Sequence, residues 1–193
     1  MSKPNKILIT GTGRCGTTFL MRLFAHLEMP NGVNADSSER GVFGNCNSGL
    51  ELDVHLTNVA RSPYILKCPS YIDKLHEAVQ KVEIDWLILP IREYQEAAQS
   101  RADHGRAAGG YLRGSNMQSE LSGAYKAIAH GIRVMTQYDI PFILLDFGRM
   151  VSDHRYLYNK LEPIMKKYAI DGKTFETAWI AASAKSKKNT RSK

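Results

Sequence analysis

The chain has 193 residues, 43% of them hydrophobic, and a formal net charge of +7 at pH 7. This length corresponds to about one domain, and the apolar content excludes a natively disordered chain, which would lack the residues to build a core. The apolar runs Trp86–Leu89 and Phe142–Leu145 are far shorter than the ~18–20 residues that cross a bilayer, so no membrane insertion is expected.

Positive charge is concentrated at the end of the chain. The last ten residues carry five of the net positive charges and no acid, which leaves +2 for residues 1–183. We therefore expect a single domain over residues 1–184, a basic and disordered tail over residues 185–193, and no nucleic-acid partner.

The cysteines and the first residues of the chain indicate the cellular location of the protein. Cys15, Cys46 and Cys68 are an odd, sparse set that does not make a disulfide framework. Residues 1–6 lack the apolar stretch and cleavage site of a signal peptide. A cytoplasmic location is the expectation.

The first third of the chain predicts one strand and one helix before a long loop. Lys6–Thr10 is an apolar strand that ends at Gly11, and apolar residues recur at helical spacing from Thr17 onward. Residues 31–49 are rich in Gly, Asn and Ser and are predicted to form a loop, followed by a short helix over 52–59.

Strands and helices alternate through the rest of the chain. Further strands are predicted at 64–67, 85–91 and 142–146. A helix capped by Ser70 follows the first of them, and glycines predict a mobile loop over 105–114. Other helices are predicted at 93–103, about 121–135, 157–168 and 174–184. The second of these is expected to turn an apolar stripe inward: Leu121, Ala124, Tyr125, Ile128, Ile132 and Met135.

Short strands that are apolar on both faces and alternate with helices are typical of parallel sheets. The expected fold is therefore α/β: a three-layer structure in which helices flank a parallel sheet of about four to five strands, as in P-loop-like nucleotide-binding proteins. Ligands of such sheets bind at the carboxyl ends of the strands, so the residues directly after each strand are the candidates for a site.

The segment Gly11–Thr18 follows a predicted strand and opens a predicted helix. Glycines let backbone N–H groups approach an anion, and the helix N-terminus adds aligned donors and a positive dipole end. The Gly-x4-Gly spacing matches the P-loop, but Thr17 stands where that motif has lysine, and Arg14 supplies a cation instead. Because that lysine contacts the β- and γ-phosphates, its absence argues against ATP or GTP hydrolysis.

Gly-Arg-Cys-Gly-Thr-Thr-Phe-Leu, residues 13–20, resembles the 5′-phosphosulfate-binding loop of sulfotransferases. The resemblance implies that 3′-phosphoadenosine 5′-phosphosulfate (PAPS) is the sulfuryl donor and 3′-phosphoadenosine 5′-phosphate (PAP) the product. It also implies donor contacts from six loop residues: Gly13, Arg14, Cys15, Gly16, Thr17 and Thr18.

A second landmark of that family is an arginine at a strand end followed eight residues later by a serine, both on the donor's 3′-phosphate. Arg92 and Ser100 match this spacing. The segment Phe142–Met150 occupies the place of the family's late strand, but lacks the Tyr and Glu of its following turn, so it supports only the order of elements. The resemblance spans residues 6–168.

Sulfuryl transfer requires cations at the leaving phosphate oxygen and at the equatorial sulfuryl oxygens. Arg14 is the candidate for the first role. Lys67, which resembles the lysine opening a Lys-Thr-His or Lys-x-Pro motif in the family, is the candidate for the second. No metal is expected to be required, because His55, Cys46 and Cys68 have no paired ligand spacing.

The cytosolic branch of the family has its base histidine two residues after that lysine, where this chain has Pro69. By resemblance to branches that use a glutamate after the first helix, the base is expected at Glu39 or Glu51, with a preference for Glu39. Three other side chains remain candidates: Asp36, Asp53 and His55.

The expected function is transfer of a sulfuryl group from PAPS to the hydroxyl or amine of a small acceptor. Loops 31–49 and 105–114 are expected to flank the cleft in which the acceptor binds. Arg106 and Arg113 either meet an anionic acceptor or face solvent. The alternatives are a P-loop kinase that uses ATP, with Asp146 holding the metal, and a non-catalytic nucleotide-binding module. The sequence leaves the acceptor and the oligomeric state open.

Overall fold

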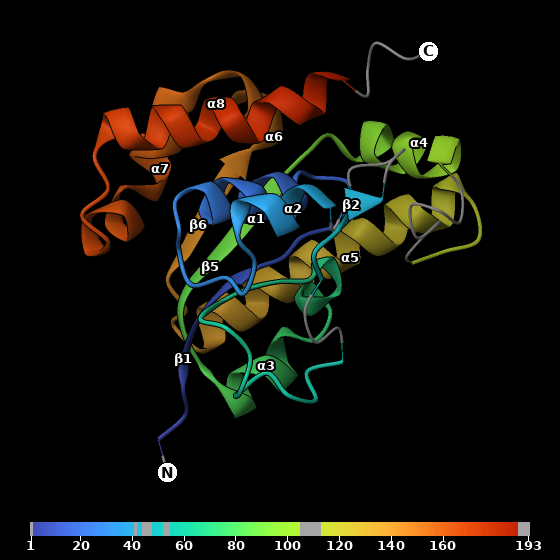
Figure 1. Ribbon diagram of the computed structural model, residues 1–193. Coiled ribbons are helices and arrows are strands. Elements are labelled where there is room, and N and C mark those ends of the chain that lie inside the picture. Colours follow the sequence, from blue (N-terminus) through green and yellow to red (C-terminus); the bar gives the residue numbers. More distant parts are fainter. Residues whose placement is uncertain (1, 41, 44–47, 52–54, 105–112, 189–193) are drawn as a thin grey trace.

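Four parallel strands form the centre of the molecule (Figure 1). The computed structural model describes residues 2–40, 42–43, 48–51, 55–104 and 113–188. In the order β4-β1-β5-β6, the strands are Ile65–Lys67, Asn5–Ile9, Glu83–Ile91 and Phe142–Asp146. The order places β1 inside the sheet, so the loop that follows β1 lies between the ends of β4 and β5.

Helices cover both faces of this sheet, which confirms the three-layer α/β fold. One layer consists of α1 (Thr17–His26), α6 (Phe147–Ser152), α7 (His154–Lys167) and α8 (Gly172–Lys188). The other contains the 3₁₀ helix η1 (Pro69–Ile72), α3 (Leu75–Lys81) and α5 (Met117–Gln137). The helix α4 (Tyr94–His104) follows β5 and packs against α5.

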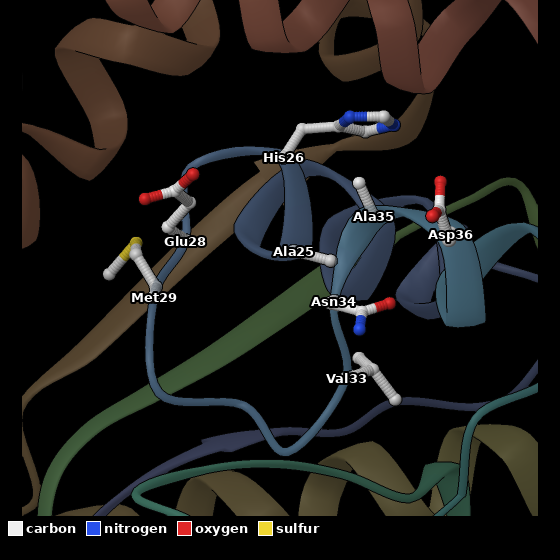
Figure 2. A pocket seen from close by; sticks show the side chains of 8 residues that line it. All are labelled: Ala25, His26, Glu28, Met29, Val33, Asn34, Ala35 and Asp36. Carbon is white, nitrogen blue, oxygen red and sulfur yellow. The ribbon is translucent and has the colours of Figure 1, made fainter.

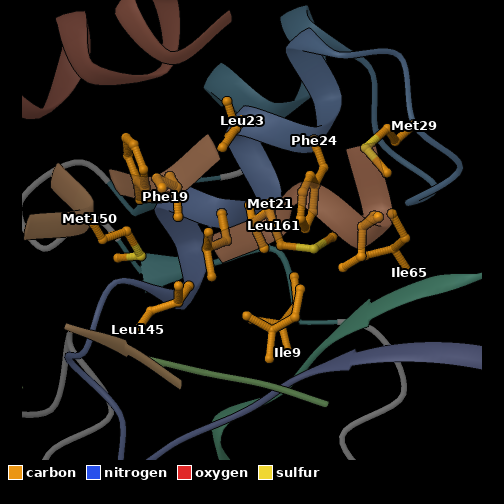
Figure 3. Packing of buried hydrophobic residues seen from close by; sticks show 14 of the residues in the cluster. Ile9, Phe19, Met21, Leu23, Phe24, Met29, Ile65, Leu145, Met150 and Leu161 are labelled. Carbon is orange, nitrogen blue, oxygen red and sulfur yellow. The ribbon is translucent and has the colours of Figure 1, made fainter. Parts of the chain in front are cut away.

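Side chains that alternate along each strand enter two separate cores. Ile7 and Ile9 of β1 join the core under α1, α7 and α8, part of which Figure 3 shows, whereas Leu8 joins the core under α3 and α5. Parallel strands are joined by crossover helices that cover both faces of the sheet, which explains why the strands are apolar on both faces.

The predicted loop over 31–49 is wrong, because the segment contains α2 (Ala35–Arg40) and a short hairpin of β2 (Val42–Phe43) and β3 (Ser48–Gly49). The start of α2 is fixed by reciprocal bonds between Asn34 and Ser37. The Ser37 N–H donates to Asn34 Oδ1 at 2.8 Å, and the Asn34 N–H donates to Ser37 Oγ at 2.9 Å. This cap satisfies N–H groups that a helix start leaves unpaired.

Two other local predictions are also wrong. Residues 55–62 form turns and bends rather than the later part of a helix, with Leu56 at a left-handed φ of 56°. Ser70 lies inside η1, and α3 begins only at Leu75, after Lys74.

The buried stripe of α5 differs from its prediction in part, since Ala124 and Met135 are buried as expected. Tyr125 and Ile132 are 58% and 52% exposed, while the buried side is built from small residues such as Ala127 and Gly131. A Cβ on Gly131 would lie 2.2 Å from Ile72 Cδ1. Close approach to η1 therefore selects the small residues and turns the large ones outward.

At its C-terminal end the chain continues as α8 to Lys188, past the expected domain end at residue 184, and residues 189–193 lie outside the described residues. Within the described ranges, no helix has both the length and the apolar character needed to cross a bilayer.

Leu161 offers a test of the α7 packing, because it is fully buried in the core that Figure 3 shows. Leu161→Ala should lower the free energy of unfolding by about 2–5 kcal/mol, as removal of a core leucine leaves a cavity. Urea unfolding would measure the loss. The matched change Ile180→Ala, at a side chain 57% exposed on α8, should leave the midpoint nearly unchanged.

Candidate anion-binding site

The β1–α1 loop, residues 10–16, turns through three left-handed residues. Gly13, Arg14 and Gly16 have φ of 81°, 55° and 89°. Glycine adopts this conformation freely, whereas a residue with a side chain does so at a cost of about 1–2 kcal/mol. Gly16 also has no room for a side chain, since a Cβ there would lie 2.5 Å from Met150 Cε. Arg14 is thus the one non-glycine residue of this loop that carries backbone strain, a conformation that it shares with residues elsewhere in the chain such as Glu28.

The N-terminus of α1 is open to a negatively charged group. Its N-cap is Gly16, which makes no side-chain cap, and its first turn has no acidic residue. Thr17 and Thr18 are buried there, and Thr18 Oγ1 donates to the Gly49 carbonyl at 3.4 Å. The N–H groups at the start of α1 are therefore suited to bind an anion.

The two predicted donor motifs meet at this loop. Arg14 Nε donates to Ser100 Oγ at 3.1 Å, although the two residues are 86 positions apart. Arg92 Nη1 donates to the Arg14 carbonyl at 3.4 Å. The Arg92–Ser100 pair and the β1–α1 loop thus form one cluster at the carboxyl ends of β1 and β5, with two guanidinium groups in it.

The third, weaker motif also reaches the cluster. Phe147, the first residue of α6, lies under the Arg92 guanidinium at 4.8 Å from ring centroid to Cζ. A Cβ on Gly16 would come within 2.9 Å of the same ring. Glu96 accepts from Arg92 Nε at 3.2 Å, a pair that solvent screens because Glu96 is exposed. Phe147 therefore orients Arg92 through the ring face.

Lys67, at the end of β4, lies beside the same edge of the sheet and is only 1% exposed. Its ammonium forms an ion pair with Glu51 and donates to the Gly49 carbonyl at 2.6 Å. Burial lowers the pKa of Lys67, and the Glu51 carboxylate acts in the opposite direction. The structure thus pairs two of the predicted catalytic residues, Lys67 and Glu51.

The other base candidates are placed differently. His55 is exposed in a turn. Asp36 lines a cavity of about 500 Å³ between the C-terminal end of α1 and the start of α2, the end of α1 opposite the β1–α1 loop (Figure 2). Glu39 belongs to α2, but its side chain lies outside the described part of the structure, as do Asp53, Cys46 and Arg106.

A buried arginine that the sequence analysis missed supports the loop. Arg101 is 2% exposed and donates to the Thr12 carbonyl and to Glu120, which is equally buried. Arg113 donates to the same Thr12 carbonyl at 3.1 Å and pairs with Asp73 at 2.6 Å. Arg113 therefore neither faces solvent nor lies free for an acceptor. The only sequence signal for Arg101 was its position next to Ser100.

Cys15 lies fully buried under the loop, and burial raises the pKa of its thiol. Among the described residues no group of three or more His, Cys, Asp or Glu side chains is arranged to hold a metal ion. Asp146, the metal-holding residue of the kinase alternative, caps α6 by accepting from the Arg149 N–H at 2.7 Å.

Comparisons of the chain with protein-family models, curated proteins and solved structures found no match. Any assignment of function therefore depends on the residues of the site.

The Arg101–Glu120 pair can be tested by removing one charge. Glu120→Gln keeps the shape of the side chain but leaves a buried guanidinium without a counter-charge, so the free energy of unfolding should fall by about 3 kcal/mol. Glu77→Gln is the matched control, because Glu77 pairs with Lys81 on the exposed side of α3. Equal urea midpoints for both variants would contradict a supporting role for the pair.

Proposed function

We propose that the protein is a PAPS-dependent sulfotransferase that transfers a sulfuryl group to the hydroxyl or amine of a small acceptor. The observation that carries this proposal is the contact of Arg14 with Ser100, with Arg92 bonded to the same loop. Two motifs that resemble separate parts of a sulfotransferase donor site are thereby adjacent in space. Adjacent ends of β1 and β5 bring the two segments together in any such sheet, and the bond between Arg14 and Ser100 further joins side chains of both motifs at one point.

The donor, PAPS, carries two anionic groups on its ribose, a 5′-phosphosulfate and a 3′-phosphate. The open N-terminus of α1 and the β1–α1 loop suit the 5′ end, where Gly16, Thr17 and Thr18 offer backbone N–H groups. Arg92 and Ser100 suit the 3′-phosphate, because a guanidinium and a hydroxyl both donate to phosphate oxygens. Arg14 belongs to the β1–α1 loop at the 5′ end, and its side chain contacts Ser100 at the 3′-phosphate position.

We assign the transfer step to Lys67 and Glu51. An ammonium that burial has desolvated interacts strongly with the charge on sulfuryl oxygens. The acceptor hydroxyl must lose its proton as its bond to sulfur forms, and we assign this proton to the Glu51 carboxylate. We favour Glu51 over Glu39 because Glu51 is held against Lys67, so that cation and base lie together. Donor binding at Lys67 would free the carboxylate for this role.

The kinase alternative gains no specific support. Thr17 stands in the place of the P-loop lysine, and the Asp146 carboxylate accepts a helix-capping bond. A thermal-shift comparison separates the two functions: a sulfotransferase is stabilised by PAP without metal, whereas a kinase prefers ATP with Mg²⁺. Stabilisation by neither nucleotide would favour a non-catalytic interaction module.

Arg92→Ala should weaken PAP binding by about 10- to 100-fold, because it removes a charge-assisted bond to phosphate. Binding of adenosine 5′-phosphate should change little, since that ligand has no 3′-phosphate. Calorimetric titration of both ligands measures the difference. Arg149→Ala, which removes an arginine stacked on Tyr156 at 4.0 Å, is the control and should bind PAP normally. Equal losses for both ligands would show that Arg92 does not read the 3′-phosphate.

Glu51→Gln should lower kcat by about 10²–10⁴-fold while PAP affinity stays nearly intact, because the change removes a base but keeps the shape of the side chain. Transfer from radiolabelled PAPS to an acceptor found by screening hydroxyl compounds measures kcat. The acidic limb of the pH profile should flatten with loss of the base. Glu39→Gln is the parallel variant: a loss confined to Glu39→Gln would assign the base there, and normal turnover in both would rule out a carboxylate base.

A further inference from the structure

Within the described residues, the four-stranded sheet has one open edge. In the register of β5 with β6, Pro141, Ile143 and Leu145 direct their backbone groups to β5, so Phe142 and Leu144 direct theirs away from the sheet. No described residue accepts from the N–H of Phe142 or Leu144. The next outward N–H, that of Asp146, donates to the Tyr156 hydroxyl at 2.8 Å, so the open stretch ends there.

The opposite edge of the sheet is closed. The three residues of β4 are all buried, and the Ile65 N–H donates to the Pro30 carbonyl at 3.0 Å. Figure 1 shows β6 at the other margin of the sheet, left of β5. Among the described strands of the four-stranded sheet, β6 is therefore the one that is open to pairing.

Apolar side chains surround the open edge. Phe142 is 50% exposed and Leu144 is 43% exposed. Both lie on the face of the sheet that packs against α5, but α5 covers this face only as far as β5. Tyr125, Ile128 and Ile132 form one flank of α5, and Tyr125 packs edge-on against Tyr94, just after β5, at 4.6 Å. We call these five residues of α5 and β6 the β6 patch: Tyr125, Ile128, Ile132, Phe142 and Leu144.

The orientation of α5 places this flank toward β6. Gly123, on the opposite flank, packs against Arg113, where a Cβ would lie 2.4 Å from Arg113 Cβ. Arg113 in turn pairs with Asp73 at the end of η1, next to β4. The flank with Tyr125 and Ile132 therefore faces the other way, toward β6.

We propose that the β6 patch is the interface of a two-fold homodimer, in which β6 of two molecules pair as antiparallel strands. An open strand edge presents backbone N–H and C=O groups that a second strand can pair, and β6 has no lysine, proline or bulge of the kind that often protects such an edge. With the two-fold axis at Ile143, Phe142 lies opposite Leu144 of the second copy. Each such pair forms two hydrogen bonds, one from the N–H of each residue to the carbonyl of the other.

A second copy fits better than an unrelated partner because the patch complements itself. Its five side chains are uncharged, so the apolar surface of one copy would meet the same apolar surface of the other. Pairing would join the two sheets into one of eight strands and bring both copies of Phe142 and Leu144 onto one face, between the two α5 helices. Since β4 is closed, assembly ends at two copies.

Sedimentation velocity of the full chain at several protein concentrations tests the proposal. The wild type should sediment at twice the 21.6 kDa mass of one chain. Leu144→Lys and Ile132→Lys, on β6 and on α5, should each weaken dimerisation at least about tenfold, because a charge enters an apolar interface. Ile180→Lys is the control, since Ile180 is 57% exposed on α8 and should leave the dimer intact.

Leu144→Pro tests the backbone pairing itself, because it removes an outward N–H and none that bonds β5. Circular dichroism establishes that each variant is folded, and hydrogen exchange gives a measurement on the unaltered chain. In the dimer the Phe142 and Leu144 amides should be protected, and dilution should expose them. A wild type with the mass of one chain, growth beyond two copies, or fast exchange at these amides at all concentrations would overturn the proposal.

Discussion

The site depends on one buried charge, the guanidinium of Arg101. It donates to the Thr12 carbonyl in the β1–α1 loop and to Glu120 in α5, and it is itself part of α4. Three elements far apart in the sequence are thereby joined at one group. A buried guanidinium is tolerated only where its donors are satisfied and its charge is balanced, so the loop, α4 and α5 can adopt few other arrangements. Arg113 adds a second donor to the same carbonyl.

This constraint extends to the residues proposed to bind the donor. Ser100 precedes Arg101 in α4, so the pair that holds Arg101 also holds Ser100 within reach of Arg14. The Phe147 ring, just after β6, stacks on Arg92 and restrains it. The Gly49 carbonyl, in the β2–β3 hairpin, accepts from Lys67 and restrains it in the same way. The candidate anion-binding cluster is therefore preorganised by contacts made outside it, which would lower the entropy lost on binding a ligand.

Periodicity and strand composition predicted the parallel sheet and most helices, because burial on both faces leaves a clear pattern in residues such as Ile7–Ile9. The meeting of Arg14, Arg92 and Ser100 at the strand ends also followed from the topology. Two features left no local signal: the Arg101–Glu120 pair depends on burial at long range, and the outward stripe of α5 depends on Gly131 meeting Ile72. The cap of α2 did leave one, since Asn34 and Ser37 stand at N-cap spacing, but the Gly- and Asn-rich surroundings favoured a loop.

The placement of Cys15 has a practical consequence for reagents that alkylate thiols. The thiol is fully buried, burial raises its pKa, and a Cβ on Gly11 would already lie 2.7 Å from its sulfur. Little thiolate is therefore present to react, and no reagent reaches the sulfur while the β1–α1 loop keeps this conformation. The rate at which a maleimide labels Cys15 would thus report how often the loop opens, with no need to introduce a cysteine.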